Sequence, residues 1–170
     1  MMAPLEPKTI PVEFSELPFS EQLVLWATRI WVRALKTETN AQGLLRTGFQ
    51  RVRAPGAHPA LDDLLTIIAV SAQCDIDIRS TTCKSVSPDE QSLMGAIAAW
   101  QSHASESVAD SFLGAWMPPS AVRLARTPTA QLATALKDVG LTIRRRKPTA
   151  NCVPNDVPDE TGESQAVTIH

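Results

Sequence analysis

The longest nearly uninterrupted apolar run in the chain lies between Leu61 and Cys74. At about 100° per residue its apolar side chains cover most of the circumference of a helix, and Asp62, Thr66 and Gln73 form the main polar strip. Such a helix is either buried among other helices or crosses a membrane. This run is shorter than the ~20 residues of a membrane span and begins with two aspartates. We therefore expect a central buried helix around which the other helices pack.

A second apolar pattern predicts a helix from about Ser20 to Lys36. Its core face consists of Leu23, Trp26, Ala27, Ile30, Trp31, Ala34 and Leu35. Leu25 and Val32 fall on the opposite, polar side, seven residues apart. Either they are tolerated surface aliphatics, or they form a second apolar seam that contacts another chain or the N-terminal arm. Together with Arg29 and Lys36 they make up the surface that we expect to bind a protein partner.

A third pattern predicts an amphipathic helix over residues 41–53. Its apolar stripe consists of Ala41, Leu44, Leu45, Gly48, Phe49 and Val52. Gly48 lies on this stripe, where the missing side chain would let another helix come close. Outside the stripe lie Arg46, Gln50, Arg51 and Arg53. The pair of helices superficially resembles a helix-turn-helix, although the turn lacks its usual glycine and the basic residues lie on both flanks. Contact with nucleic acid through these four residues is the alternative to a solvated basic face.

Further helices are predicted from their start and stop residues. The motif SPDE at residues 87–90 is a capping box with proline in the first turn. Another helix follows Ser105, and one or two helical turns cover residues 120–125. The last helix is predicted to begin at Thr127 and to end at Gly140 and Leu141 in a Schellman-type turn.

The segment from Asp75 to Arg79 alternates between polar and apolar residues, as a short extended segment does. No second strand pattern is visible to pair with it. We therefore expect no sheet, but a long ordered loop with Ile76 and Ile78 tucked under the helices.

Both ends of the chain lack helical patterns. Residues 1–14 are predicted to form a disordered arm, because prolines recur there. The basic run from Arg144 to Lys147 and the polar residues after it place a disordered tail over residues 142–170. Residues 15–141 would form a single domain. The predicted fold is an all-α, irregular orthogonal bundle of six to seven helices around the helix at Leu61–Cys74.

Composition narrows the function classes. The formal net charge is −2, which argues against a protein that holds nucleic acid through a general positive field. The charges are unevenly spread, because six basic residues and one acid lie between Arg29 and Arg53. There is no signal-peptide pattern and no membrane span, so we expect a cytoplasmic protein with Cys74, Cys83 and Cys152 as reduced thiols. A redox pairing of Cys74 with Cys83 stays open.

No motif for catalysis or metal binding is visible. His58 and His103 are not in zinc-binding spacing with the cysteines, and no calcium loop surrounds Asp75 and Asp77. A nucleophilic Cys83 paired with a histidine would need a preorganised pocket. We therefore predict no catalytic, cofactor-binding or metal-binding residue and no cofactor.

Two stretches, LPFSEQLVLWATRIWVRAL and SPDEQSLMGAI, are separated by the cysteine-bearing loop. This combination resembles small uncharacterised all-helical proteins of alphaproteobacteria over residues 17–141. The resemblance implies a cytosolic bacterial setting and carries no activity. The function predicted first is that of a non-enzymatic partner-binding or regulatory protein, which could be a homodimer. The alternatives are a DNA-binding regulator, or a small enzyme or ligand-binding domain at the loop from Cys74 to Ser87.

Overall fold

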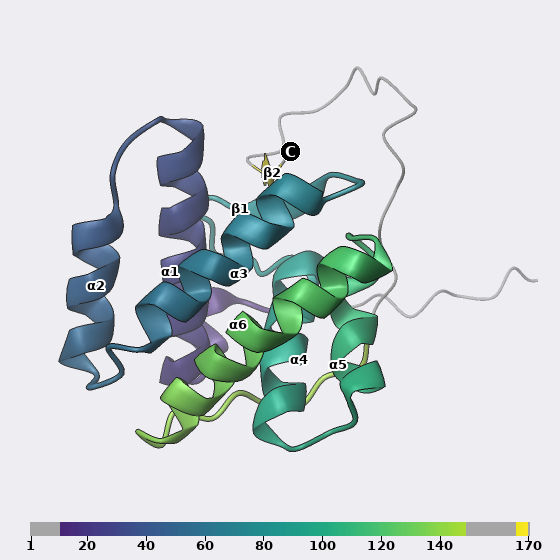
Figure 1. Cartoon of the computed structure of the whole chain (residues 1–170). Helices are drawn as coiled ribbons and strands as arrows, with labels where there is room; N and C mark the ends of the chain where they lie inside the picture. The colour runs from purple at the N-terminus through teal and green to yellow at the C-terminus, as the bar shows by residue number, and fades with distance from the viewer. Residues whose placement is uncertain (1–10, 149–165, 170) are drawn as a thin grey trace, which may run out of the picture.

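The computed structural model describes residues 11–148 and the backbone of residues 166–169, and in this part of the chain it is built mainly from helices (Figure 1). A short 3-10 turn, η1, precedes six α-helices, and strand β1 pairs with strand β2. The bounds are η1 Phe14–Glu16, α1 Phe19–Lys36, α2 Gln42–Arg51, α3 Ala57–Ser71, β1 Ile76–Arg79, α4 Pro88–Gln101, α5 Glu106–Leu113, α6 Pro119–Lys137 and β2 Ala166–Ile169. The all-α class is confirmed. None of the described helices has the length and apolar character needed to cross a bilayer.

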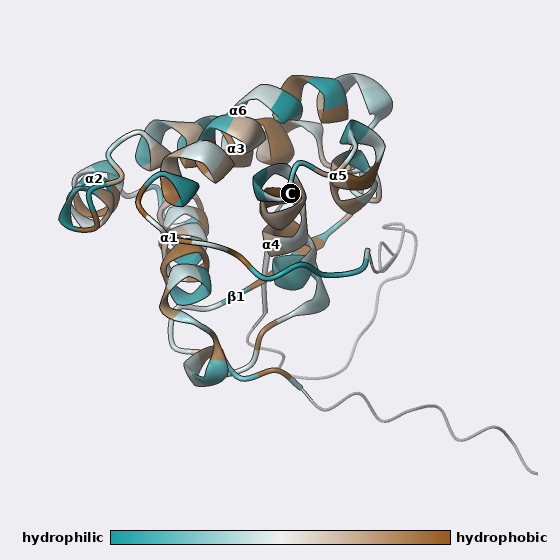
Figure 2. Cartoon of the chain, turned by 90° about the horizontal axis from the view of Figure 1, so that it is seen from below, coloured by the Kyte–Doolittle hydropathy of each residue, from teal (hydrophilic) through white to brown (hydrophobic). Residues whose placement is uncertain are grey.

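Helices α3 and α6 pack together as one layer across α1, α4 and α5, and β1 lies beside α1 and α4 (Figure 2). Helix α4 is therefore the central helix, and its residues from Ser92 to Ala99 are all buried. Gly95 helps to place it there, because a Cβ at this position would overlap the ring of Phe112 from α5. The expectation that the run at Leu61–Cys74 is the central helix is wrong. That helix, α3, is amphipathic in its setting and leaves Val70 79% exposed.

The prediction that Leu25 and Val32 lie on an exposed side of α1 is also wrong. The two side chains are 0% and 1% exposed, and Arg29 between them is 3% exposed. All three lie on one face of α1, at i, i+4 and i+7. The Arg29 side chain is directed to α4 and the loop before it, so this face is turned inward. Arg29 made the face look polar, although its charge is neutralised inside the protein. Of the four predicted partner-binding residues, only Lys36 is exposed.

The predicted capping box at the start of α4 is confirmed. Ser87 Oγ accepts the backbone N–H of Glu90 at 3.0 Å, and the Glu90 carboxylate accepts the N–H of Ser87 at 3.0 Å. The predicted helix start at Thr127 is wrong, because α6 runs without a break from Pro119 through Pro128. The missing N–H of Pro128 does not stop the helix, since the surrounding turns are held by their own packing and hydrogen bonds.

Part of the predicted tail is folded. Ile143 is 6% exposed, and the backbone at Thr142, Ile143 and Arg144 bonds to side chains of α1 and α4. Farther on, β2 pairs antiparallel with β1, so the expectation that no sheet forms is wrong. A disordered tail is therefore excluded for residues 142–148, and the helical unit extends at least to Pro148. The predictions for residues 1–10, 149–165 and 170 lie outside the described residues.

Candidate functional site

An open apolar groove lies between helices α1 and α2, with a volume of about 360 Å³. It is lined by Phe14, Phe19, Gln22, Leu23, Trp26, Gly48, Arg51 and Val52. Phe19, in the first turn of α1, is 59% exposed. Burying an aromatic side chain of this size stabilises a contact by about 1.5–3 kcal/mol. The groove therefore offers an apolar surface that the described residues leave uncovered.

Gly48 shapes the floor of this groove. A Cβ at Gly48 would lie 2.8 Å from two ring carbons of Trp26, which is closer than carbon atoms pack. The absence of a side chain therefore allows the indole of α1 to lie directly against α2. The prediction that Gly48 permits a close approach is confirmed, and the approaching group is an aromatic ring.

Phe14 connects the groove to the interior. The Arg29 guanidinium lies 5.1 Å from the centre of the Phe14 ring, within the range of a cation–π contact. The backbone beside it is also anchored, because Phe14 N–H donates to Lys84 O at 2.7 Å and Val86 N–H donates to Val12 O at 2.9 Å. The wall of the groove at Phe14 is thus in contact with Arg29 and with the loop that precedes α4.

The predicted nucleic-acid residues surround one side of the same helix pair. Arg46, Gln50, Arg51 and Arg53 are all exposed on α2 or directly after it. No ion pair among the described residues involves any of these arginines. Arg51 also lines the groove, so a positive charge stands at the edge of the apolar surface. All four side chains are exposed, and the described residues leave the charges of the three arginines available to a partner.

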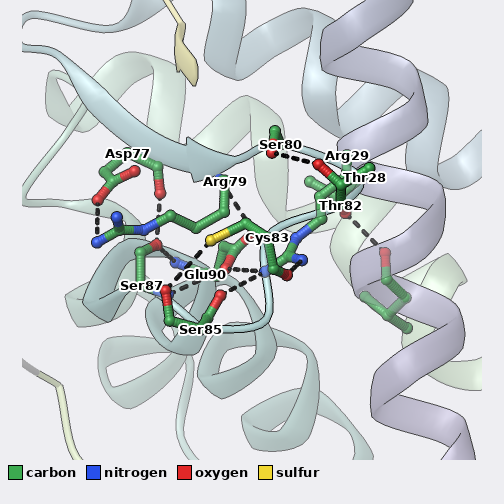
Figure 3. Close-up of polar contacts among 11 residues, drawn as sticks. Thr28, Arg29, Asp77, Arg79, Ser80, Thr82, Cys83, Ser85, Ser87 and Glu90 are labelled. Atoms are coloured by element: carbon green, nitrogen blue, oxygen red, sulfur yellow. Dashed lines mark hydrogen bonds and ion pairs between the residues drawn. The ribbon is translucent and has the colours of Figure 1, made fainter. Parts of the chain in front are cut away.

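A buried polar cluster lies on an adjoining face of α1, at the N-terminus of α4 (Figure 3). Its centre is a paired contact in which Arg29 Nε and Nη2 donate to the two carboxylate oxygens of Glu90 at 2.7 and 2.9 Å. Both side chains are almost fully buried. The remaining donors of Arg29 reach Cys83 O at 2.7 Å and Ser85 O at 2.9 Å. Each nitrogen of the buried guanidinium therefore has a hydrogen-bond partner, as burial of a charge requires.

The same cluster fixes strand β1. Glu90 accepts the backbone N–H of Arg79 at 3.2 Å, and Asp89 accepts that of Asp77 at 2.7 Å. Burial raises the pKa of both Asp77 and Asp89, because it disfavours their charged forms. Asp77 forms an ion pair with Arg79 at 2.9 Å, while Asp77 Oδ1 and Arg79 Nε have no hydrogen-bond partner among the described residues. The carboxylates of Asp89 and Glu90 thus serve as acceptors for the backbone of β1.

The residues that the sequence analysis considered for catalysis or metal binding do not lie together in the structure. Cys83 lies beside the N-terminal end of α4, where its sulfur is 3.3 Å from Ser85 Oγ. His103 follows the C-terminal end of the same helix and contacts Lys137 Nζ at 3.1 Å. A Cys83–His103 pair is therefore excluded. Neither Asp77 nor Cys83 lines the groove or four other pockets that the described residues form. No group of three or more His, Cys, Asp or Glu among the described residues is placed to hold a metal ion.

His58 takes part in a chain of hydrogen bonds between helices. Its Nε2 lies 2.6 Å from Gln42 Oε1, and Gln42 Nε2 donates to Asp62 Oδ1 at 2.8 Å. Asp62 also accepts the indole N–H of Trp31 at 2.6 Å. This chain of contacts joins α1, α2 and α3 on the side of α2 away from the groove.

The cysteines differ from the prediction. Cys74 is disulfide-bonded and Cys83 is free and half-buried. The expectation of reduced thiols is therefore wrong for Cys74, and the proposed pairing of Cys74 with Cys83 does not occur. Cys152 lies outside the described residues. The thiol argument for a cytosolic protein is weakened, because disulfides persist mainly in oxidising compartments.

The basic run after α6 binds a buried carboxylate. Glu21 in the first turn of α1 is 0% exposed. It accepts bonds from Arg144 Nη2 at 2.9 Å and from Arg146 Nη2 at 2.7 Å, and also from the backbone N–H of Arg144 at 2.9 Å. Although burial alone would raise it, these bonds lower the pKa of Glu21 from 4.5 to about 2. We call this contact the Glu21 clamp.

Comparison of the chain with protein-family models, curated proteins and solved structures finds no match. The groove, the basic residues of α2 and the Glu21 clamp are therefore interpreted from their own geometry. The residues that sequence reasoning missed are Phe19, which precedes the predicted helix start, and Trp26, which was assigned to the core. The sequence contains one signal for the contact between Trp26 and Gly48, because both residues lie on the apolar stripes of neighbouring helices.

Proposed function

We propose that this protein is a non-enzymatic partner-binding protein, and that its contact surface is the groove between α1 and α2. The observation that carries the proposal is Phe19, an aromatic side chain 59% exposed at the edge of an apolar groove. Exposed apolar surface bordered by polar residues is typical of a protein-interaction site. The proposed partner-binding surface is therefore not the face of Leu25 and Val32, which is buried, but another face of the same helix.

The chemistry of the partner follows from the groove and its border. Trp26, Leu23 and Val52 present apolar surface that suits aliphatic or aromatic anchors at helical spacing. Arg51 at the border and the exposed Arg46 and Arg53 carry positive charge that no acid among the described residues pairs with. We therefore expect an amphipathic segment with apolar anchors on one face and acidic residues beside them. Complementary charge of this kind increases the rate and specificity of association.

The experiment is site-specific photo-cross-linking in the native cell, with benzoylphenylalanine in place of Phe19. A matched control carries the same group in place of Leu124, which is 68% exposed on α6. We expect a product only from position 19, and its cross-linked peptide should map to an acidic amphipathic segment. A synthetic peptide of that segment should bind the protein, and Gly48→Leu should weaken binding at least tenfold. Gly43→Leu on the same helix, where a Cβ meets open space, should leave it unchanged.

Equal products from both positions would show that the groove is not selective. Equal binding by the Gly48→Leu and Gly43→Leu variants would place the contact elsewhere. A cross-link to a second copy of this chain would instead support the homodimer that the sequence left open.

Nucleic-acid binding is the second candidate, because Arg46, Gln50, Arg51 and Arg53 are all exposed and lack described ion pairs. It predicts a gel shift that weakens steeply with salt. The double substitution of Arg46 and Arg53 by alanine should abolish that shift, whereas Phe19→Ser should not. Partner binding in the groove predicts the reverse ranking. Absence of binding at low salt would remove this candidate.

A cytoplasmic location remains part of the proposal. The redox state of Cys74 in the cell tests this location, because Cys74 is disulfide-bonded in the structure and a cytoplasmic protein is expected to keep its thiols reduced. Because Cys74 is only 4% exposed, the cells are quenched with acid and the protein is alkylated after denaturation, and Cys74 should be labelled if the protein resides in the cytoplasm. Protection of Cys74 would place the protein in an oxidising compartment.

A further inference from the structure

Strand β1 has two edges with different partners. On one edge, the backbone N–H groups of Asp77 and Arg79 donate to the carboxylates of Asp89 and Glu90. Successive N–H groups along a strand point in opposite directions, so those of Ile76 and Ile78 are directed to the other edge. That second edge, which we call the outer edge, carries β2. The carboxylates of α4 thus fix β1 as a strand and leave its outer edge for pairing.

The outer edge is occupied by the chain itself. Strand β2, Ala166–Ile169, pairs antiparallel with β1 in the register Ile76↔Ile169 and Ile78↔Val167 (Figure 1). Because the N–H of Ile78 points to this edge, we assign Ile78↔Val167 as a hydrogen-bonded pair and Asp77↔Thr168 as a non-hydrogen-bonded pair. The ladder is four residues long, and an isolated ladder of two strands is marginally stable in water. The pairing of β2 with β1 therefore has little stability of its own.

The Glu21 clamp is a second, independent contact of the C-terminal segment. Ser20 Oγ–H donates to Thr142 O at 2.6 Å, next to the bonds between Glu21 and the two arginines. The clamp fixes the chain up to Arg146, so residues 149–165 form the remaining connection to β2. Pairing through such a connection is intramolecular, which gives β2 a high effective concentration at β1.

We propose that the outer edge of β1 is a binding site for an extended peptide segment of a partner protein, and that β2 is its built-in competitor. Ile76 and Ile78 are 0% and 2% exposed, so their side chains are committed to the core. Recognition at this edge therefore rests on main-chain hydrogen bonds, as in strand addition to an exposed sheet edge. The site is separate from the groove between α1 and α2, and it does not depend on the function proposed for that groove.

The test uses the full chain and a fluorescent peptide with the sequence of residues 163–170, ESQAVTIH, as the probe. Val167→Pro removes an N–H that the ladder uses and should release the internal strand. Val167→Ala keeps that N–H and is the matched control. We expect Val167→Pro to bind the probe at least tenfold more tightly than the unmodified protein, measured by fluorescence anisotropy. Val167→Ala should bind it within a factor of three of the unmodified protein.

Probes methylated on single backbone nitrogens give the second readout. Methylation at the valine of the probe should abolish binding to the Val167→Pro protein, because that N–H faces β1. Methylation at the threonine should change the affinity less than twofold, because its N–H faces away. Equal effects of the two methyl groups, or no binding of the probe to any variant, would overturn the proposal. A dimeric unmodified protein that becomes monomeric in Val167→Pro would also overturn it, since β2 would then come from a second copy.

Discussion

Two faces of helix α1 reverse the usual distribution of polar and apolar residues. One face buries Arg29 against Glu90, and another exposes Phe19 and half-exposes Trp26. The buried charge is satisfied within the chain, whereas the exposed aromatic group has no equivalent cover among the described residues. The face with Arg29 is thus an internal contact between α1 and α4, which we call the internal joint. The apolar groove, in contrast, is a surface available to a partner. Exposed apolar residues and buried polar residues are the informative departures from an ordinary globular pattern.

The largest effect is expected from breaking the internal joint. Glu90→Ala leaves the Arg29 guanidinium buried without its carboxylate and also removes the acceptor for the backbone N–H of Arg79. Removing one partner of a buried ion pair destabilises a protein by about 3–5 kcal/mol. We expect a loss of this size in the free energy of unfolding, measured by urea denaturation.

A surface pair provides the comparison for this experiment. Arg126 is bound to Glu106 at 2.6 Å and to Asp110 at 2.5 Å, but these side chains are partly exposed. Arg126→Ala should therefore lower the free energy of unfolding much less than Glu90→Ala does. If Glu90→Ala costs no more than Arg126→Ala, the polar cluster is not the joint that we describe.

Local patterns in the sequence predicted the helical class and several helix ends. The capping box at Ser87 and the ending at Gly140 depend on neighbouring residues only, and both appear as predicted. Gly140 has a φ of 78°, and the N–H of Leu141 donates to Leu136 O at 2.9 Å. Such features are encoded within a few residues, so a single sequence is enough to find them.

The predictions that were wrong concern contacts between residues far apart in the sequence. The face of Leu25 and Val32 looked solvent-exposed because Arg29 lies between them, and its partner Glu90 is 61 residues away. Pairing of β1 with β2 joins segments about 90 positions apart, and only β1 has an alternating pattern that indicates a strand. The groove was missed for the same reason, since it requires knowing that α2 covers Trp26 only partly. A periodic pattern identifies a face but not its partner.

An intermediate effect is expected at the Glu21 clamp, which ties the C-terminal segment to α1. Glu21→Gln should lower the free energy of unfolding at pH 7 by about 1–2 kcal/mol, because Arg144 is partly solvated in this contact. The pKa of Glu21 is about 2 in the folded protein and 4.5 in its ordinary state. A lowered pKa stabilises the fold above pH 4.5, and this contribution disappears as the pH falls from 4.5 to about 2.

Urea denaturation at several pH values checks this expectation. The difference between the unmodified protein and Glu21→Gln should be full at pH 7 and should approach zero near pH 2. Glu16→Gln, at an exposed position close by, should show no such pH dependence. A difference that is constant over this range would mean that the charge of Glu21 does not hold the segment.

The smallest effect compares two glycines on α2, one inside the groove and one outside it. Gly43 faces open space, so Gly43→Ala should raise the free energy of unfolding by about 0.5–1 kcal/mol through helix propensity alone. Gly48→Ala gains the same propensity but places a Cβ 2.8 Å from the ring of Trp26. The ring must move outward, so we expect a net loss of up to about 1 kcal/mol and a red-shifted tryptophan emission. If both variants were equally stabilised, the indole would not lie against Gly48, and the floor of the groove would differ from the one described.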